Sequence, residues 1–200
     1  MGKNIIRISF SVLILFTTSE LFSQISTGKT ASSESIKEYH SSTLELKSNT
    51  IPDSVFLLTN LISLSIQGMD CDYVITDENG KDITQCWMIH KIPPQIKNLK
   101  KLESLRLNVN AINRIPGELA ELKNLKSLDL NDNPGLSNID NITRLSNLEE
   151  LGVFGCGLTS LPSNIGELKK LKYLGLSGNH IDKIELLRIR KALPNCEVVF

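Results

Sequence analysis

The stretch 102–124 reads LESLRLNVNAINRIPGELAELKN, and its spacing of apolar residues decides the fold of the chain. The same spacing starts again at Leu125, Leu148 and Leu171, so the chain repeats with a period of 23 residues. A fixed period of this length is typical of a stacked-repeat solenoid, in which each unit buries its apolar residues only against its neighbours. The recurring positions of the four copies are Leu102, Leu105, Leu107, Asn110, Ile112 and Ile115; Leu125, Leu128, Leu130, Asn133, Leu136 and Ile139; Leu148, Leu151, Val153, Cys156, Leu158 and Leu161; and Leu171, Leu174, Leu176, Asn179, Ile181 and Ile184.

Each repeat is predicted to contain one strand and one returning segment. Leu105 and Leu107 alternate with polar residues, which is the period-2 pattern of a strand with one buried face. The return that begins at Pro116 carries Leu119 and Leu122 at helical spacing, and proline suits the first turn of a helix. Every strand is entered in the same direction, so we expect a parallel sheet on the concave face and short helices or turns on the convex face.

Partial copies extend the pattern in both directions. Leu44 and Leu46 predict a first strand, and Cys196 and Val198 predict a last one, which gives seven strands in all. The Ile-Pro pair at Ile92 lies about 18 residues further from the preceding strand than the repeat requires. We therefore expect an insertion over 70–88.

The first residues resemble a targeting segment. Lys3 and Arg7 begin a stretch with a short apolar run, and residues 17–23 are mostly small or polar, which predicts a secretory signal peptide over 1–23. A membrane anchor is the alternative, but the run is about half of the roughly 20 residues that span a bilayer. Residues 24–42 are polar and predict a flexible leader, because they cannot bury enough surface to offset their ordering entropy. The mature chain is expected to be secreted or extracellular, or at the periplasm or cell surface of a bacterium.

The motif L-x-x-L-x-L-x-x-N-x-L-x-x-I-P resembles the leucine-rich repeat family, in its 23-residue form with Ile-Pro or Leu-Pro in the middle of the repeat. The resemblance covers 43–200 and implies an α/β, right-handed solenoid domain with a curved parallel sheet. It also implies protein binding as the main use of that sheet, because members of the family use their concave faces mainly in this way.

A column of asparagines is expected inside the stack. The chain turns sharply after each strand and leaves buried backbone groups that need partners. A side-chain amide both donates and accepts hydrogen bonds, so asparagines at one frame position can satisfy consecutive turns. The residues predicted for this ladder are Asn49, Asn110, Asn133, Asn179 and, as a weak donor, Cys156. Met69 occupies the same position and cannot donate, so the ladder is expected to break there.

The insertion carries Cys71 and Cys86, for which we expect a disulfide in a secreted chain. Two strand-like segments flank Asn79-Gly80, a strong hairpin signal, although a two-residue turn would place Tyr73 opposite Cys86. A bulge or a longer loop would therefore be needed to bring the two sulfurs opposite one another. No metal is expected, because the spacings of zinc and calcium sites are missing. Cys156 and Cys196 are too far apart in the frame to bond and are expected to be reduced and buried.

The outward residues of the strands form the predicted ligand-binding face. Phe154 and Tyr173 are aromatic and lie on neighbouring repeats, beside Gly152 and Gly175. Exposed aromatics near arginine are typical anchors of binding hot spots. The alternative is that the two rings only cover the glycines; the insertion, with Trp87, is a second candidate surface. The residues predicted to bind a ligand are Arg106, Asn108, Asp129, Asn131, Phe154 and Tyr173.

The composition argues against other functions. With 22 basic and 22 acidic residues, the formal charge is zero, so no nucleic acid or anionic membrane is expected as a partner. The three histidines fall at unrelated frame positions, and no catalytic group or phosphate loop can be assembled, so neither an enzyme nor a cofactor is expected. We predict a secreted, monomeric recognition module for a protein or peptide, without insertion into a membrane after signal cleavage. The alternative is a structural or adhesive surface component without a single defined partner.

Overall fold

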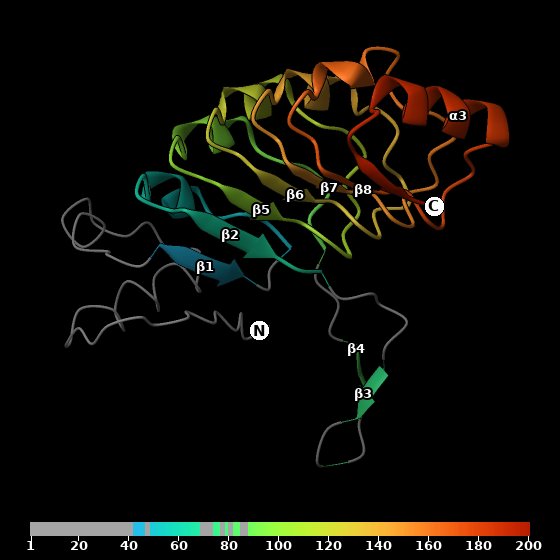
Figure 1. Cartoon of the computed structure of the whole chain (residues 1–200). Coiled ribbons are helices and arrows are strands. Elements are labelled where there is room, and N and C mark those ends of the chain that lie inside the picture. Colours follow the sequence, from blue (N-terminus) through green and yellow to red (C-terminus); the bar gives the residue numbers. More distant parts are fainter. Residues whose placement is uncertain (1–41, 47–48, 69–73, 77–78, 80–81, 85–87) are drawn as a thin grey trace.

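A parallel sheet runs the length of the molecule, with its strands in the order β1-β2-β5-β6-β7-β8-β9 (Figure 1). The computed structural model describes residues 42–46, 49–68, 74–76, 79, 82–84 and 88–200. The seven strands are β1 (Thr43–Leu46), β2 (Ser63–Ile66), β5 (Ser104–Arg106), β6 (Ser127–Asp129), β7 (Glu150–Gly152), β8 (Tyr173–Gly175) and β9 (Glu197–Val199). The parallel sheet of seven strands predicted from the repeat is confirmed.

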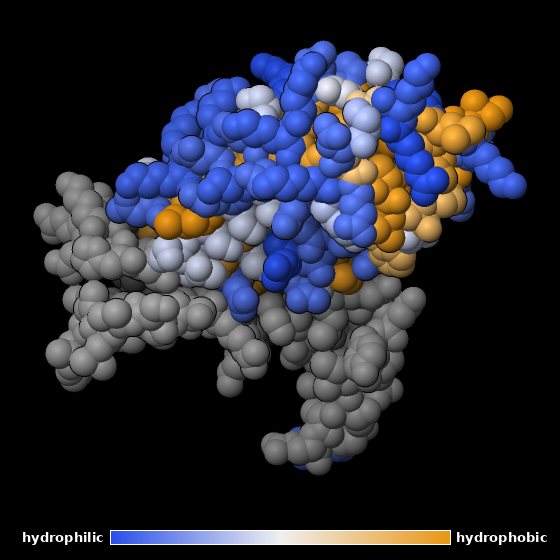
Figure 2. Space-filling model, viewed as in Figure 1, coloured by the Kyte–Doolittle hydropathy of each residue, from blue (hydrophilic) through white to orange (hydrophobic). Residues whose placement is uncertain are grey.

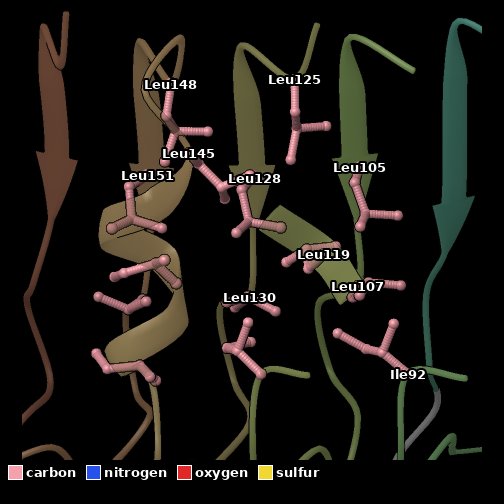
Figure 3. Packing of buried hydrophobic residues seen from close by; sticks show 14 of the residues in the cluster. Ile92, Leu105, Leu107, Leu119, Leu125, Leu128, Leu130, Leu145, Leu148 and Leu151 are labelled. Atoms are coloured by element: carbon pink, nitrogen blue, oxygen red, sulfur yellow. The ribbon is translucent and has the colours of Figure 1, made fainter. Parts of the chain in front are cut away.

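The register stacks the same frame position of every repeat. Leu105 lies opposite Leu64 on one side and Leu128 on the other, and Leu128 lies opposite Leu151. These side chains are at most 1% exposed and belong to one continuous hydrophobic cluster. Figure 3 shows leucines of successive repeats pointing into the same interior. The stacked interior explains why the repeats stabilise one another rather than forming separate cores.

The segments that return across the convex face are short 3₁₀ helices (Figure 1). They are η1 (Asp53–Leu57), η2 (Pro94–Asn98), η3 (Gly117–Glu121), η4 (Asp140–Arg144) and η5 (Ile165–Glu167). A 3₁₀ helix rises about 2.0 Å per residue against about 1.5 Å for an α-helix, so it crosses this face with fewer residues. Pro116 occupies the N-cap of η3 in extended conformation, not its first turn as predicted.

The last return is a longer helix, α3 (Lys183–Ala192), and it corrects one prediction. Ile184 was expected inside, at the frame position of Ile115, but it is 80% exposed. Asp182 caps α3 by accepting a hydrogen bond from the backbone N–H of Glu185 at 2.8 Å. The helix therefore starts one residue after Asp182 and turns Ile184 outward, while Ile189 provides its buried contact.

The described part of the insertion forms a two-stranded antiparallel sheet, β3 (Val74–Thr76) and β4 (Asp82–Thr84), apart from the main sheet (Figure 1). A hairpin is therefore present, but Ile75 pairs with Ile83 and Thr76 with Asp82. This register is one residue away from that of a two-residue Asn79-Gly80 turn, so a longer connection joins the strands. Cys71, Cys86, Trp87 and Met69 lie outside the described residues, as do the predicted signal peptide and leader.

Candidate functional site

The outward residues of the strands lie in three rows across the sheet. The first row is Thr43, Ser63, Ser104, Ser127, Glu150, Tyr173 and Glu197, and the second is Glu45, Ser65, Arg106, Asp129, Gly152, Gly175 and Val199. Backbone hydrogen bonds continue the register into a third row of Gln67, Asn108, Asn131, Phe154 and Ser177. All six residues predicted to bind a ligand belong to these rows. We call the three rows together the strand face.

Arg106 and Asp129 are neighbours in the second row. The guanidinium Nε of Arg106 lies 3.6 Å from Oδ2 of Asp129, and the arginine side chain remains 57% exposed. The other carboxylate oxygen of Asp129 accepts a hydrogen bond from the backbone N–H of Asn131 at 3.1 Å. Asp129 is therefore already engaged on both sides, whereas Arg106 keeps donors free for a ligand.

Asn131 positions Phe154 in the third row. Its Oδ1 accepts a hydrogen bond from the backbone N–H of Phe154 at 2.7 Å. Gly152 makes room for this amide, because a methyl group there would lie 2.8 Å from the same oxygen. The Phe154 ring is 45% exposed and rests against Gly178, where a methyl group would lie 3.2 Å from its Cε2. Asn108, in the preceding repeat, has a buried Oδ1 for which the described part of the chain provides no hydrogen-bond donor.

Tyr173 lies over its own strand. A methyl group on Gly175 would be 3.4 Å from Cε1 of Tyr173 and 3.5 Å from its hydroxyl oxygen. Gly175 is buried although it belongs to the strand face, and the ring above it is 40% exposed. Tyr173 and Phe154 thus lie on neighbouring repeats but two rows apart, with Gly152 and Gly175 in the row between them. Tyr173 therefore covers Gly175, whereas Phe154 contacts Gly178 rather than Gly152, and both residues still present area to solvent.

The asparagine column fixes the turns that follow the strands. Nδ2 of Asn133 donates to the backbone carbonyls of Leu107 and Leu130, at 3.0 and 2.8 Å, while its Oδ1 accepts from the N–H of Ile112 at 2.9 Å. Asn110 and Asn179 repeat this pattern. At Cys156 the thiol takes the donor role, with its Sγ 3.2 Å from the carbonyl oxygen of Leu130.

The column adapts around the insertion. The side chain of Asn110 connects the residues on the two sides of the insertion. Its Nδ2 donates to the carbonyl of Ile66 at 2.8 Å, and its Oδ1 accepts from the N–H of Ile89 at 2.9 Å. Ile89 is 1% exposed and therefore re-enters the repeat frame directly after the insertion. Asn49 is exposed, and its Oδ1 accepts from the N–H of Met88.

Two features of the turns were not predicted. The residues before Asn110, Asn133, Cys156 and Asn179 are left-handed, with φ of 56° at Val109, 55° at Asp132, 62° at Gly155 and 74° at Gly178. The two glycines at this frame position were the available signal. A second row of exposed asparagines also joins repeats: Nδ2 of Asn124 donates to the carbonyl of Lys100 at 2.8 Å, and Nδ2 of Asn147 to that of Lys123 at 2.6 Å. Their recurrence directly before Leu125 and Leu148 was the available signal.

Both described cysteines are free. Burial raises the pKa of the Cys156 thiol to about 11, so it stays protonated at neutral pH and can donate its hydrogen bond. Burial also raises the pKa of Cys196 to about 11, although this residue is only half-buried, not fully buried as expected. Among the described residues, no group of three or more histidines, cysteines, aspartates or glutamates could hold a metal ion.

A groove of about 350 Å³ lies at the C-terminal end of the stack, away from the strand face. Leu168, Leu171, Leu193 and Pro194 contribute apolar walls, and Lys169 and Lys191 contribute charge. No helix within the described ranges is long and apolar enough to cross a membrane.

Comparison with known proteins agrees with the repeat pattern. A family model for leucine-rich repeats, two copies long, matches residues 100–144. The chain is similar to a leucine-rich repeat protein of Leptospira interrogans, with 28% identity and a TM-score of 0.59 over 77% of this chain and 41% of the other. It is also similar in fold to an internalin of Listeria monocytogenes, with 21% identity and a TM-score of 0.59 over 80% of this chain and 41% of the internalin.

The leucine-rich repeat domain of the type III effector XopL is a further structural neighbour, with 25% identity and a TM-score of 0.54. The alignment covers 76% of this chain and 56% of the effector domain, so the chain spans about half or less of each of these three structures. No curated protein matches the chain. The repeat, the parallel sheet and these neighbours make the chain a leucine-rich repeat protein. Its repeats follow the 23-residue form, with Pro116 and Pro162 in the middle of two of the four copies. This fold commonly serves as a protein-binding scaffold rather than an enzyme.

Proposed function

We propose that the chain is a secreted recognition module that binds a protein or peptide on its strand face. The observation that carries the proposal is the pair of exposed aromatic rings, Phe154 and Tyr173, on a sheet whose other outward residues are mostly small or polar. Aromatic side chains bury large areas at low entropic cost, which is why they anchor interfaces. Both rings are held in place before binding, Phe154 through Asn131 and Tyr173 over Gly175.

Arg106, Asn108, Asp129 and Asn131 complete the proposed surface. Arg106 carries an exposed guanidinium beside Asp129, and Asn108 and Asn131 are neighbours in the third row. Such polar groups around aromatic anchors give register and specificity more than affinity. Secretion is part of the proposal and depends on cleavage of the signal peptide 1–23.

The test is affinity capture from the extracellular fraction of the native organism with the mature chain 24–200. We expect one stoichiometric partner, whose affinity falls by at least tenfold in the Phe154→Ala/Tyr173→Ala double variant, because hot-spot aromatics contribute more than about 1 kcal/mol each. The matched control is Leu57→Ala/Ile62→Ala, which removes two exposed apolar side chains, of 53% and 42% exposure, from outside the strand face. Equal capture by both double variants would contradict the proposal.

A structural or adhesive role without a single partner is the second candidate. Exposed cross-repeat ion pairs and the exposed asparagine row join neighbouring repeats outside the core, which is consistent with a robust spacer. Capture of no protein, or of many proteins with equal yield, would favour this role over recognition.

A further inference from the structure

The C-terminal half of the strand face has an uncompensated negative charge. Between β6 and β9 the described outward residues include three carboxylates and no cation. The carboxylates belong to Asp129, Glu150 and Glu197, and only Asp129 has a cationic neighbour, Arg106 of β5. Lys126 and Lys172, which directly precede β6 and β8, form ion pairs at 2.8 Å with Glu103 and at 2.6 Å with Glu149, at the edge where the strands begin.

Tyr173 lies between the two remaining carboxylates. The sheet register places it directly beside Glu150 on one side and Glu197 on the other. Neighbouring parallel strands are about 4.8 Å apart, so a group above the ring is within reach of both carboxylates. Glu150 accepts a hydrogen bond from the hydroxyl of Ser127 at 3.1 Å, which orients its side chain along the row. Neither glutamate forms an ion pair with any described residue.

The ring of Tyr173 presents a flat aromatic surface to solvent. The ring rests against Gly175, and 40% of the residue remains exposed to solvent. The open face of a phenol ring attracts cations through its quadrupole, and the interaction strengthens when carboxylates flank the ring. Figure 2 shows a mostly hydrophilic visible surface, with hydrophobic residues gathered toward the C-terminal end of the stack. The two carboxylates beside Tyr173 favour a cationic group over a purely apolar one at this position.

We propose that this part of the strand face binds a basic, extended segment of a polypeptide, with an arginine or lysine side chain above Tyr173 and between Glu150 and Glu197. The inference rests on the proposed function, since it names the chemistry of the partner for the same face. The ligand cation pairs with two carboxylates for which the described residues provide no ion-pair partner, so an acidic or neutral segment would gain nothing from them.

The test uses three fluorescein-labelled octapeptides that alternate serine with arginine, glutamine or glutamate, and fluorescence anisotropy with the chain 24–200 at low salt. We expect saturable one-to-one binding of the arginine peptide and none of the glutamate peptide. Glu150→Gln/Glu197→Gln should weaken binding by about tenfold or more, and Tyr173→Leu should weaken it while Tyr173→Phe retains it. The matched charge control is Glu118→Gln/Glu167→Gln, which removes two glutamates from the convex side.

Two results would overturn the inference: no binding of the arginine peptide, or equal binding by the Glu150→Gln/Glu197→Gln and control variants. Capture of the natural partner by the same variants distinguishes failure of this inference from failure of the proposed function. If its capture is lost in Phe154→Ala/Tyr173→Ala but unchanged in Glu150→Gln/Glu197→Gln, the strand face binds, but not through a basic segment. If capture is unchanged in both, neither proposal holds. Thermal midpoints of all variants should match that of the wild-type chain, because none of the substituted residues is buried.

Discussion

Single buried asparagine side chains hold the turns of successive repeats together through hydrogen bonds. Asn133 is fully buried and its side chain satisfies backbone groups in two successive turns. A buried donor or acceptor that loses its partner costs about 1–3 kcal/mol, because water cannot replace the bond. The regular spacing of the strand face therefore depends on residues that no ligand touches.

We expect Asn133→Ala to lower the free energy of unfolding by about 1–3 kcal/mol, since it leaves the buried N–H of Ile112 without its acceptor and removes one of the two amide donors to the carbonyl of Leu107. Urea denaturation followed by circular dichroism measures the change. Asn113→Ala, at an exposed position of the preceding repeat, is the control and should change stability by less than about 0.5 kcal/mol. Equal effects of the two substitutions would show that the column does not stabilise the turns.

Val109 stores backbone strain. Its φ of 56° is left-handed, which a β-branched residue tolerates poorly. Gly155 and Gly178 occupy the same frame position two and three repeats further along the chain. The left-handed region costs an L-residue roughly 1–2 kcal/mol, partly offset by the extra entropy of glycine in the unfolded chain. Val109→Gly should therefore raise the free energy of unfolding by about 0.5–1 kcal/mol in urea denaturation. A loss of stability would mean that the Val109 side chain contributes packing that outweighs the strain.

At the scale of elements, α3 is tied to the preceding repeat by charged hydrogen bonds. Glu185 accepts from the N–H of Leu161 at 2.9 Å and from Nη2 of Arg188 at 2.6 Å, and Arg188 donates to the carbonyl of Leu161 at 2.8 Å. The hydrogen bond from Arg188 is the main cause that lowers the pKa of Glu185 below its usual 4.5. The ionised carboxylate of Glu185 therefore helps to hold α3 against the convex side of the preceding repeat.

This clamp predicts a pH dependence. A carboxyl whose pKa is lowered on folding contributes stability that is present above its unfolded pKa and is lost as the pH falls through its folded pKa. The chain should therefore lose stability as the pH drops below about 4.5, with a smaller loss in Glu185→Gln. Glu118→Gln is the control, because that glutamate forms no ion pair with a described residue. Denaturation at pH 7 and pH 3.5 measures both variants, and parallel losses would contradict the role of Glu185.

The repeat elements were predictable and the last helix was not, for a physical reason. A leucine at a fixed offset predicts burial as long as the backbone keeps the frame, which holds from Leu102 to Leu176. Asp182 ends the frame locally, because an N-cap followed by strong helix formers favours a longer helix over another short return. Ile184 then points outward although its sequence position matches Ile115. A local capping signal here overrides the global period.

The strand face was predictable as a set of residues, but not its contacts. Alternation assigns Arg106, Phe154 and Tyr173 to the outside of the sheet, because side chains of a strand point to opposite faces in turn. The position of the Tyr173 ring over Gly175, and the bond from Asn131 that holds Phe154, depend on rotamers and on neighbouring strands. The charge imbalance around Glu150 and Glu197 can be recognised only from the strand register and the ion pairs. The repeat period alone determines neither of these.

At the scale of the whole molecule, the insertion is expected to be dispensable for the stack. Asn110 already joins Ile66 to Ile89, the residues on its two sides, and Ile89 occupies the frame position that follows a column asparagine. We expect deletion of residues 71–88 combined with Met69→Asn to leave a folded chain with a thermal midpoint within a few degrees of the wild type. The control is the deletion without Met69→Asn. It lacks the amide at this position of the column and should have a lower thermal midpoint. An unfolded chain in both cases would show that the insertion helps to hold the stack together.

The central claim is that the ligand meets the strand face. Site-specific photo-cross-linking tests it most directly: a photoreactive amino acid replaces, one at a time, Ser104, Ser127 and Tyr173 on the strand face and Glu118, Arg144 and Glu167 on the convex side. Irradiation is carried out in the presence of the captured partner. The account predicts adducts from the strand-face positions and none from the convex positions. Adducts from the convex positions alone, or from all six equally, would contradict it.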